Sequence, residues 1–454
     1  MGIDGTRDHA GGRAGDLAGN PTVEQSANNG PDHQSVVDDG HARIAWVRQF
    51  SPVMNGLVRD VVSDGSLKGK RIAVVVHLEA KTAYLASVLA GAGADVIVAG
   101  SNPYTTNGAV VAALRDKGIR VVSEAGGTHV TWEEELRKAA DLEPEYIIDD
   151  GAELTMRVGI HRPDVFARLK GVSEETTTGT ARLYALEAAG KLPFPALTAN
   201  DARCKHLFDN RYGTGQTTLQ AVLRLSNRQI AGAQVVVLGY GYVGRGIAEY
   251  ALKLRAQVRV IEVDPVRALE AHMDGHRVGT AADLLPGADF VITATGGMRA
   301  IGAPEFAHLS DNTVLANAGH HDLEIDVVAL AGLAASANLA TSGASACAQP
   351  PAPPGITTYR LGDRALHVLS NGALVNIAGG AGHPVEIMDL TFAVQGLGAH
   401  YLVNTPLAPG VHVLPKAVDD SIAAAKLLSM GITLGVGRPE QADDHGDIIS
   451  RIAT

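Results

Sequence analysis

Cysteine is almost absent from this 454-residue chain, which contains only Cys204 and Cys347. Two cysteines exclude a disulfide framework and a cysteine-rich metal cluster, so we expect no metal ligands. No apolar run is long enough to span a bilayer, and the polar N-terminus lacks the apolar core of a signal peptide. These absences predict a cytoplasmic protein that does not enter a membrane.

Basic residues are also scarce, since 38 Lys and Arg stand against 49 Asp and Glu and give a formal net charge of -11. A nucleic-acid-binding surface needs a basic stripe, so this balance argues against a nucleic-acid partner. Apolar residues make up 46% of the chain and charged residues 19%, a composition typical of globular proteins. The length favours two domains over one.

Short β-branched runs alternate with helical stretches over most of the chain. This alternation predicts an α/β fold with two doubly wound parallel sheets, each in a Rossmann-like domain. Residues 1–40 are rich in Gly, Asp, Asn and Ser, lack apolar periodicity, and are predicted to be disordered. The predicted strands are 72–76, 96–99, 120–122 and 146–148 in the first series, and 234–238, 258–263, 289–294 and 313–316 in the second.

A glycine-rich turn, Gly-Tyr-Gly-Tyr-Val-Gly at 239–244, follows the apolar run 235–238 and opens a helical stretch. Its glycines allow a tight turn, close approach of the backbone to a pyrophosphate, and packing of helix on strand. Glu262 ends the next strand, where a carboxylate accepts hydrogen bonds from ribose hydroxyls and repels a 2′-phosphate. A purely structural turn is the alternative, but the register of strand, glycines, helix and acid predicts NAD binding.

Polar side chains gather where predicted strands end, which is where doubly wound sheets bind ligands. Each has an ordinary interpretation: His77 as a structural histidine, Asp149-Asp150 or Asp209-Asn210 as a helix cap, and Lys205 as a surface lysine. In chain order, the candidates are His77, Asp149, Asp150, the Ser-Glu-Glu-Thr-Thr-Thr-Gly run at 173–179, Lys205, the Phe-Asp-Asn-Arg-Tyr-Gly run at 208–213, Asn317, His320, Asn376 and His383.

Taken in this order, the set resembles the S-adenosylhomocysteine hydrolase family from about Ile44 to Lys416. The runs at 173–179 and 208–213, the glycine-rich turn, and Gly-His-x-Asp-x-Glu-Ile-Asp at 319–326 carry the resemblance. It implies an enzyme in which NAD+ oxidises a ribose 3′-hydroxyl, a C4′ proton is removed, the C5′ substituent leaves, water adds, and NADH restores the hydroxyl. We expect a substrate-binding domain over 41–212, an NAD-binding domain over 213–380, a return to the first domain over 381–408, and a C-terminal tail over 409–454.

The resemblance also implies a role for each matching residue. The catalytic set comprises Lys205, Asp209, Asp150, His77 and His320, with a lysine pKa depressed by a dry site and a cationic nicotinamide. The expected substrate contacts are Glu175, Glu79, Lys81, Thr82, Asn102, His321, His383 and Met388. The expected cofactor contacts are Thr176, Thr177, Thr178, Asn210, Gly239, Gly241, Tyr242, Val243, Gly244, Glu262, Thr295, Asn317 and Asn376.

Several pockets depart from the family pattern. Where the family has Met-Thr-x-Gln/Glu-Thr, this chain has Leu-Glu-Ala-Lys-Thr at 78–82, and a lysine cannot accept a hydrogen bond from the amine of adenine. Either adenine is read differently, another base is read, or Glu79 and Lys81 simply pair with each other. The run 100–108 and the residue at Glu153 differ too, and His321, Thr214 and Ala381 replace a family Phe, Cys and Met.

The C-terminal run 448–454 lacks the Lys and Tyr of the family tail, which predicts weaker retention of NAD and a homo-oligomer that is either a dimer or a tetramer. Because the redox residues are kept and the leaving-group pocket is altered, we expect a dehydratase acting on an adenine-type nucleoside. The alternatives are ordinary S-adenosylhomocysteine hydrolysis, a dehydrogenase that releases NADH, and a non-catalytic NAD-binding regulator. Retention of Lys205 and Asp209 argues against the regulator.

Overall fold

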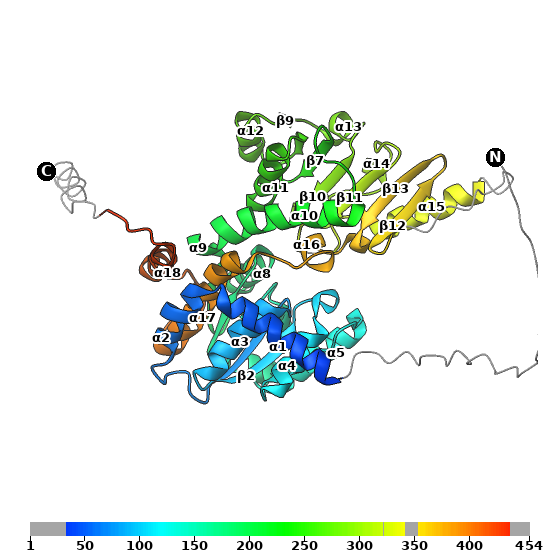
Figure 1. The fold of residues 1–454 in the computed structure, drawn as a ribbon. Coiled ribbons are helices and arrows are strands. Elements are labelled where there is room, and N and C mark those ends of the chain that lie inside the picture. Colours follow the sequence, from blue (N-terminus) through cyan, green and yellow to red (C-terminus); the bar gives the residue numbers. More distant parts are fainter. Residues whose placement is uncertain (1–32, 321, 341–352, 436–454) are drawn as a thin grey trace, which may run out of the picture.

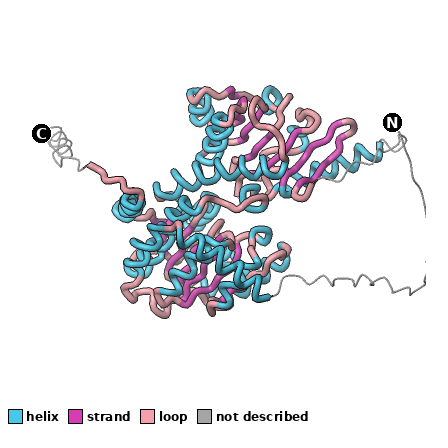
Figure 2. The backbone as a smooth tube through the Cα atoms, in the orientation of Figure 1, coloured by secondary structure: helices cyan, strands magenta, loops and turns pink. Residues whose placement is uncertain are grey.

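The computed structural model describes residues 33–320, 322–340 and 353–435, which form two seven-stranded sheets flanked by helices (Figures 1 and 2). The predicted fold class of two Rossmann-like α/β units is confirmed. Helix α1 (His33–Gln49) begins inside the segment expected to be disordered, so that prediction is wrong for residues 33–40. Val37 is buried there, and a Cβ at Gly40 would clash with the Ala109 carbonyl, because α1 packs closely on α4 (Gly108–Asp116). Residues 1–32 lie outside the described part.

The first sheet is parallel throughout, in the order β14-β6-β5-β4-β1-β2-β3. Its central strands are almost entirely buried, as strands covered by helices on both faces must be. The strands are β1 (Arg71–Val76), β2 (Asp95–Gly100), β3 (Arg120–Val121), β4 (Tyr146–Asp149), β5 (Gly171–Glu174), β6 (Pro195–Thr198) and β14 (Gly410–His412). The further helices of this unit are η1 (Met54–Val58), α2 (Arg59–Val62), α3 (Ala80–Gly91), η2 (Pro103–Thr105), α5 (His129–Asp141), α6 (Glu153–His161), α7 (Pro163–Phe166), α8 (Thr177–Ala188), η3 (Ala199–Asp201), α9 (Arg203–Lys205), η4 (His206–Gly213), α17 (Val385–Asn404) and α18 (Lys416–Ser429).

The second sheet has the order β12-β13-β11-β10-β7-β8-β9 and is parallel except for the antiparallel pair β12–β13 at its edge. That hairpin and strands β5, β6, β9 and β14 were not among the predicted strands. The strands are β7 (Gln234–Leu238), β8 (Gln257–Ile261), β9 (Arg277–Val278), β10 (Phe290–Thr293), β11 (Thr313–Asn317), β12 (Ile356–Leu361) and β13 (Arg364–Leu369). The helices are α10 (Thr214–Ser226), α11 (Tyr242–Lys253), α12 (Pro265–Met273), α13 (Ala281–Leu284), α14 (Ala303–Phe306), α15 (Val327–Ala340), η5 (Ser370–Gly372) and α16 (Val375–Ala378).

The chain returns to the first unit after α16. Figure 1 shows α17, in orange, lying within the lower unit, and its residues pack against β5, η1 and α3. The segment predicted as a C-terminal tail also contributes to this unit, because β14 pairs with β6 and α18 packs on α17. The predicted limits at 212/213 and 380/381 stay a prediction. No helix among the described residues is long and apolar enough to cross a membrane.

Candidate active site

The carboxyl ends of both sheets face one cavity of about 470 Å³. The first sheet contributes His77 after β1, Asp150 after β4 and Glu175 after β5, while the second contributes Thr295 after β10 and His320 after β11. Parallel strands end at the same edge of a sheet, so side chains far apart in the sequence converge there. The predicted residues that line the cavity are His77, Glu79, Lys81, Thr82, Asp150, Glu175, Thr176, Thr177, Thr178, Lys205, Asp209, Asn210, Gly241, Tyr242, Val243, Thr295, His320, Asn376, His383 and Met388.

Lys205 is buried at the centre of a polar cluster. It ends α9, and the π-helical turn η4 that follows carries Asp209 and Asn210 back toward it. The Lys205 Nζ lies 3.1 Å from Asp209 Oδ1, 2.7 Å from Asn210 Oδ1 and 3.4 Å from Glu175 Oε1. A buried ammonium is tolerated only when it is paired in this way, so the cluster is a fixed arrangement and not a solvated surface lysine.

The attraction between Lys205 and its two carboxylate neighbours determines which of these groups carry a proton. Burial alone would lower the pKa of Lys205, but Asp209 and Glu175 outweigh burial and raise it. Burial raises the pKa of Glu175, against the attraction of Lys205. The expectation of a depressed lysine pKa is therefore wrong for the protein alone, since the sequence could not show two carboxylates beside one ammonium. A positive charge entering the cavity would lower the lysine pKa again.

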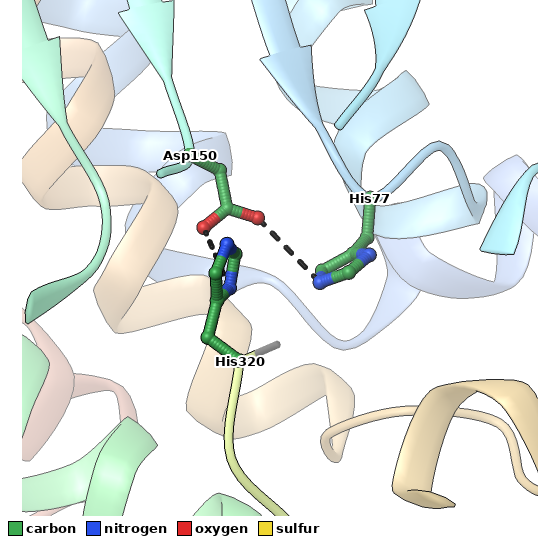
Figure 3. A group of neighbouring side chains, drawn as sticks. All are labelled: His77, Asp150 and His320. Carbon is green, nitrogen blue, oxygen red and sulfur yellow. Dashed lines mark ion pairs between the residues drawn. The ribbon is translucent and has the colours of Figure 1, made fainter. Parts of the chain in front are cut away.

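His77, Asp150 and His320 form a second group, in which each imidazole ring lies beside a different oxygen of the carboxylate (Figure 3). His77 Nε2 lies 3.5 Å from Asp150 Oδ2, and His320 Nδ1 lies 3.7 Å from Asp150 Oδ1. Thr105 Oγ1 lies 2.8 Å from His77 Nδ1, and the Ser101 hydroxyl donates to Asp150 Oδ2 at 3.0 Å. Burial lowers the pKa of His77, which suits a neutral ring that exchanges protons.

The same three side chains could hold a cation. One donor atom from each of His77, Asp150 and His320 lies within 4.8 Å of the other two, and the sequence did not predict this group. Two histidines and a carboxylate suit a transition metal. They equally suit proton transfer, and the contacts between rings and carboxylate are those of acid–base partners.

Lys81, which is buried, forms an ion pair on the cavity wall with Glu79, which is partly buried. Lys81 Nζ lies 2.8 Å from Glu79 Oε2 and donates a hydrogen bond to the Ala381 carbonyl at 3.1 Å. Glu79 also caps α3 by accepting from the Lys81 backbone N–H at 3.1 Å. The pairing considered from the sequence is present, and both side chains also face the cavity.

The glycine-rich turn after β7 has the geometry that a dinucleotide needs. Gly239 has φ +93°, and a Cβ there would lie 2.6 Å from the Ala294 carbonyl oxygen. A Cβ at Gly244 would clash with the Gly239 carbonyl, so only glycine fits at both positions. Gly241 is the N-cap of α11, whose first N–H groups and dipole favour a pyrophosphate.

Two further groups fit NAD. Glu262 follows β8, and its carboxylate accepts from the backbone N–H groups of Tyr240 at 2.6 Å and Asp264 at 2.9 Å, which fixes it at the end of the strand. Asn376 lines the cavity and donates to Thr217 Oγ1, but its buried Oδ1 has no hydrogen-bond partner among the described residues. An unsatisfied buried amide oxygen is costly, and the carboxamide of a nicotinamide would satisfy it.

Some predicted residues lie elsewhere. Asn102 caps η2 by accepting from the Tyr104 N–H. Asn317 is fully buried and holds the following loop, because it accepts from the Gly319 N–H and donates to the Gly372 carbonyl. Glu262, Gly239 and Gly244 shape the turn without lining the cavity wall, and His321 lies outside the described residues.

The sequence did not reveal three other residues of the cavity wall. Asn200 follows the unpredicted strand β6 and accepts from Asn210 Nδ2 at 3.1 Å. Arg267 approaches Gly241 from α12, with nothing in its local sequence to indicate a ligand. Phe392 lies four residues after Met388 on α17, a helical spacing that could have been recognised.

Two Rossmann-like sheets around one cavity, a dinucleotide turn and a buried lysine between two carboxylates define an NAD-dependent α/β enzyme. Sequence profiles described as S-adenosyl-L-homocysteine hydrolase and its NAD binding domain match residues 33–163 and 210–382. The chain belongs to the S-adenosyl-L-homocysteine hydrolase family, and its cofactor is NAD.

Individual relatives match over nearly their whole lengths. The adenosylhomocysteinase of Thermotoga maritima is 43% identical over 401 residues, covering 88% of this chain and 96% of the relative. The adenosylhomocysteinase of Thermococcus kodakarensis is 44% identical over 403 residues, covering 88% and 93%. The S-inosyl-L-homocysteine hydrolase of Methanosarcina acetivorans is 41% identical over 402 residues, covering 88% and 95%.

These relatives overturn the dehydratase prediction. Proteins that match this chain at such identity are named hydrolases of S-nucleosyl-homocysteines, whether the nucleoside is adenosine or inosine. The altered pockets therefore do not indicate loss of water.

Proposed function

We propose that this enzyme hydrolyses the thioether of an S-nucleosyl-L-homocysteine whose base is a 6-oxopurine, as in S-inosyl-L-homocysteine. The observation that carries the choice of base is the Glu79–Lys81 pair, which lies on the cavity wall. The relatives named S-inosyl-L-homocysteine hydrolase, at 40% and 41% identity, support it.

With Lys81 facing position 6 of the base and Glu79 facing N1, the arrangement that we propose, the two side chains complement hypoxanthine and oppose adenine. Hypoxanthine presents a carbonyl acceptor at position 6 and an N1–H donor, whereas adenine presents an amine donor and an N1 acceptor. A lysine only donates hydrogen bonds, and a carboxylate only accepts them. Lys81 directs N–H groups to Glu79 and to the Ala381 carbonyl, and an ammonium has a third N–H for the base oxygen. Glu79 would accept from N1–H.

S-adenosyl-L-homocysteine is the second candidate substrate. Relatives named adenosylhomocysteinase reach 43% and 44% identity over almost their whole lengths. With adenine in the orientation proposed for hypoxanthine, Lys81 would face an amine donor, and one of the two would stay unsatisfied, which costs roughly 1–3 kcal/mol. Adenine would be accepted only if Glu79 faced its amine and Lys81 its N1.

In the proposed reaction the lysine cluster acts on the ribose. The positive charge of NAD+ in the cavity would lower the pKa of Lys205, and the neutral amine, held by Asp209 and Asn210, would then take the proton of the 3′-hydroxyl while Glu175 accepts a hydrogen bond from the neighbouring hydroxyl. Bound NAD supplies the hydride acceptor for the first half of the cycle and the hydride for the second. The 3′-ketone that results acidifies the C4′ proton.

The His77–Asp150–His320 group acts on the other side of the sugar. Asp150 removes the C4′ proton, and a neighbouring neutral imidazole passes that proton to the sulfur leaving C5′. Water then adds its oxygen to C5′, and Asp150 carries a proton from that water to C4′, so the C4′ hydrogen of the product comes from the solvent. The same groups then work in reverse, and NAD is regenerated without net change.

The test is turnover of synthetic thioethers by purified protein supplied with NAD+. Homocysteine release, measured with a thiol reagent, and nucleoside release, measured by mass spectrometry, are compared for the inosyl and adenosyl substrates. We expect kcat/KM to be at least about 10-fold higher for the inosyl substrate, with no net NADH at 340 nm. Absence of homocysteine from both substrates would overturn the proposal, and steady NADH release would identify a dehydrogenase.

A further inference from the structure

Helix α17 places two polar side chains behind the lysine cluster. Thr391 and Gln395 lie one helical turn apart, and both are 0% exposed in an otherwise apolar stretch of the helix. The Thr391 hydroxyl donates to Asp209 Oδ2 at 3.0 Å, and Gln395 Nε2 donates to Glu175 Oε2 at 2.6 Å. Each of these α17 side chains therefore contacts one of the two carboxylates that flank Lys205.

The two carboxylates are each held from both sides. Asp209 uses Oδ1 for Lys205 Nζ and Oδ2 for Thr391, and Glu175 uses Oε1 for Lys205 Nζ and Oε2 for Gln395. A carboxylate bonded through both oxygens cannot rotate without losing a hydrogen bond. Its distance to the lysine is therefore fixed by the helix as well as by charge attraction.

A third contact orients the amide of Gln395. The Ser173 hydroxyl on β5 donates to Gln395 Oε1 at 2.6 Å, which leaves the Gln395 NH₂ group to face Glu175. Ser173 is buried and lies two residues before Glu175 on the same chain segment. Ser173, Gln395 and Glu175 thus form a continuous chain of hydrogen bonds from the sheet to the lysine.

We propose that Thr391 and Gln395 are positioning residues, which hold Asp209 and Glu175 in the orientation that allows Lys205 to exchange a proton with the ribose. This inference rests on the proposed function for its catalytic readout. Neither side chain is expected to touch the substrate. Their effect passes through the two carboxylates.

Loss of either hydrogen bond has a predictable electrostatic result. Glu175 faces Lys205, Asp209 and Asp150, and Gln395 is the neutral donor that favours its charged form. Without Gln395, one buried carboxylate oxygen loses its donor, so the pKa of Glu175 rises further and the protonated form persists to higher pH. Asp209 faces Lys205, Glu175 and His383, and loss of the Thr391 donor raises its pKa in the same way.

The variants for the test are nearly isosteric. Gln395→Met and Thr391→Val remove the donors while keeping the volume of each side chain, and Thr391→Ser keeps the hydroxyl. Leu390→Ala is the matched control, because Leu390 is a buried apolar residue on the same helix that contacts neither carboxylate in the hydrogen-bond network. Leu390→Ala is expected to lower the free energy of unfolding and to show the same dependence of kcat on pH as the wild type.

The measurements are kcat and KM against pH, and single-turnover oxidation of free nucleoside followed as NADH at 340 nm. A hydrogen bond to a charged group is worth about 1.5–3 kcal/mol, which corresponds to roughly 10- to 150-fold in rate. We expect Gln395→Met and Thr391→Val to lower kcat at neutral pH by about this factor, with a smaller change in KM, and to move the acidic limb of the profile to higher pH. Thr391→Ser is expected to restore most of the rate.

Unchanged kcat and pH profiles in both donor variants, or changes matched by Leu390→Ala, would overturn the positioning role. Failure of the proposed function is seen separately, as a wild-type protein that releases no homocysteine from either thioether. The positioning role is then tested by measuring the free energy of unfolding against pH in the wild type and in Gln395→Met. Loss of the Gln395 donor must move the pH at which Glu175 titrates to a higher value. An unshifted titration refutes it without any need for turnover.

Discussion

Replacement of Lys81 by glutamine should change which base the enzyme prefers. The Lys81 side chain is 8% exposed and makes its contacts with Glu79 and the Ala381 carbonyl. Its loss removes a charged hydrogen-bond donor from the proposed base site, which is worth about 1.5–3 kcal/mol, or roughly 10- to 150-fold in kcat/KM for the inosyl substrate. A glutamine amide can also accept a hydrogen bond from an exocyclic amine, so activity on the adenosyl substrate should rise.

The assay is kcat/KM for both thioethers in wild type, Lys81→Gln and a matched control. Lys170→Gln is the control, because Lys170 pairs with Glu145 on the surface and is half exposed, outside the cavity wall. The ratio of inosyl to adenosyl activity should fall by about 100-fold or more in Lys81→Gln and stay unchanged in Lys170→Gln. An equal loss on both substrates would refute base reading by Lys81 and leave it a purely structural lysine.

Other consequences of the structure can be measured on the same protein. Gly244→Ala forces a Cβ onto the Gly239 carbonyl, so NAD affinity measured by calorimetry should fall at least about 10-fold, and wild-type affinity would contradict the cofactor site. Asp389 is buried and accepts a hydrogen bond from Lys426 Nζ at 2.9 Å. Asp389→Ala should lower the free energy of unfolding in urea by about 3–5 kcal/mol. A loss below about 1 kcal/mol would mean that this ion pair does not stabilise the fold. Burial raises the pKa of Asp149 from 3.8 to about 6. The protonated carboxyl therefore contributes fully to the free energy of unfolding below about pH 4, and this contribution is lost as the pH rises through 6. Between pH 4 and 7, the free energy of unfolding of the wild type should therefore fall relative to that of Asp149→Asn by up to about 3 kcal/mol. A difference between the two proteins that does not depend on pH would contradict the raised pKa of Asp149.

Local sequence patterns predicted the fold class because the residues that indicate a strand or a turn lie close together in the sequence. The apolar run at β7, the glycines after it and Glu262 at the end of β8 lie within about 30 residues, the span of a single strand–helix–strand unit. Strands β5 (Gly-Val-Ser-Glu) and β6 (Pro-Ala-Leu-Thr) were missed because they lack the continuous apolar run that marks the equally short strands β4 and β10. Residues 33–40 were wrongly expected to be disordered, because α1 is held by its packing against α4 at Gly40, a contact that no local pattern records.

The candidate site was predictable as a set of residues but not as a network. Lys205, Asp209 and Glu175 were expected from motifs, and the cavity brings them together. The pairing of Lys205 with two carboxylates depends on the fold, and it reverses the direction expected for the lysine pKa. Thr391 and Gln395 carried no signal, since a threonine and a glutamine in an apolar helix are common and their partners lie far away in the sequence.

The substrate expectation failed for a different reason. Departures from a motif show that a pocket has changed without showing which ligand the change serves. The altered leaving-group pocket predicted loss of water, whereas relatives that are 43% and 41% identical are named hydrolases. The cytoplasmic location and the number of subunits stay predictions.

The central claim is that a thioether is hydrolysed through transient oxidation of the sugar and removal of the C4′ proton. Its most direct test is turnover of S-inosyl-L-homocysteine in D₂O by the NAD-supplied enzyme, with the nucleoside product analysed by mass spectrometry and NMR. The account predicts homocysteine and inosine with deuterium at C4′ and no net NADH. Homocysteine release with an unlabelled C4′ would contradict it, because the bond would then have been cleaved without the redox cycle.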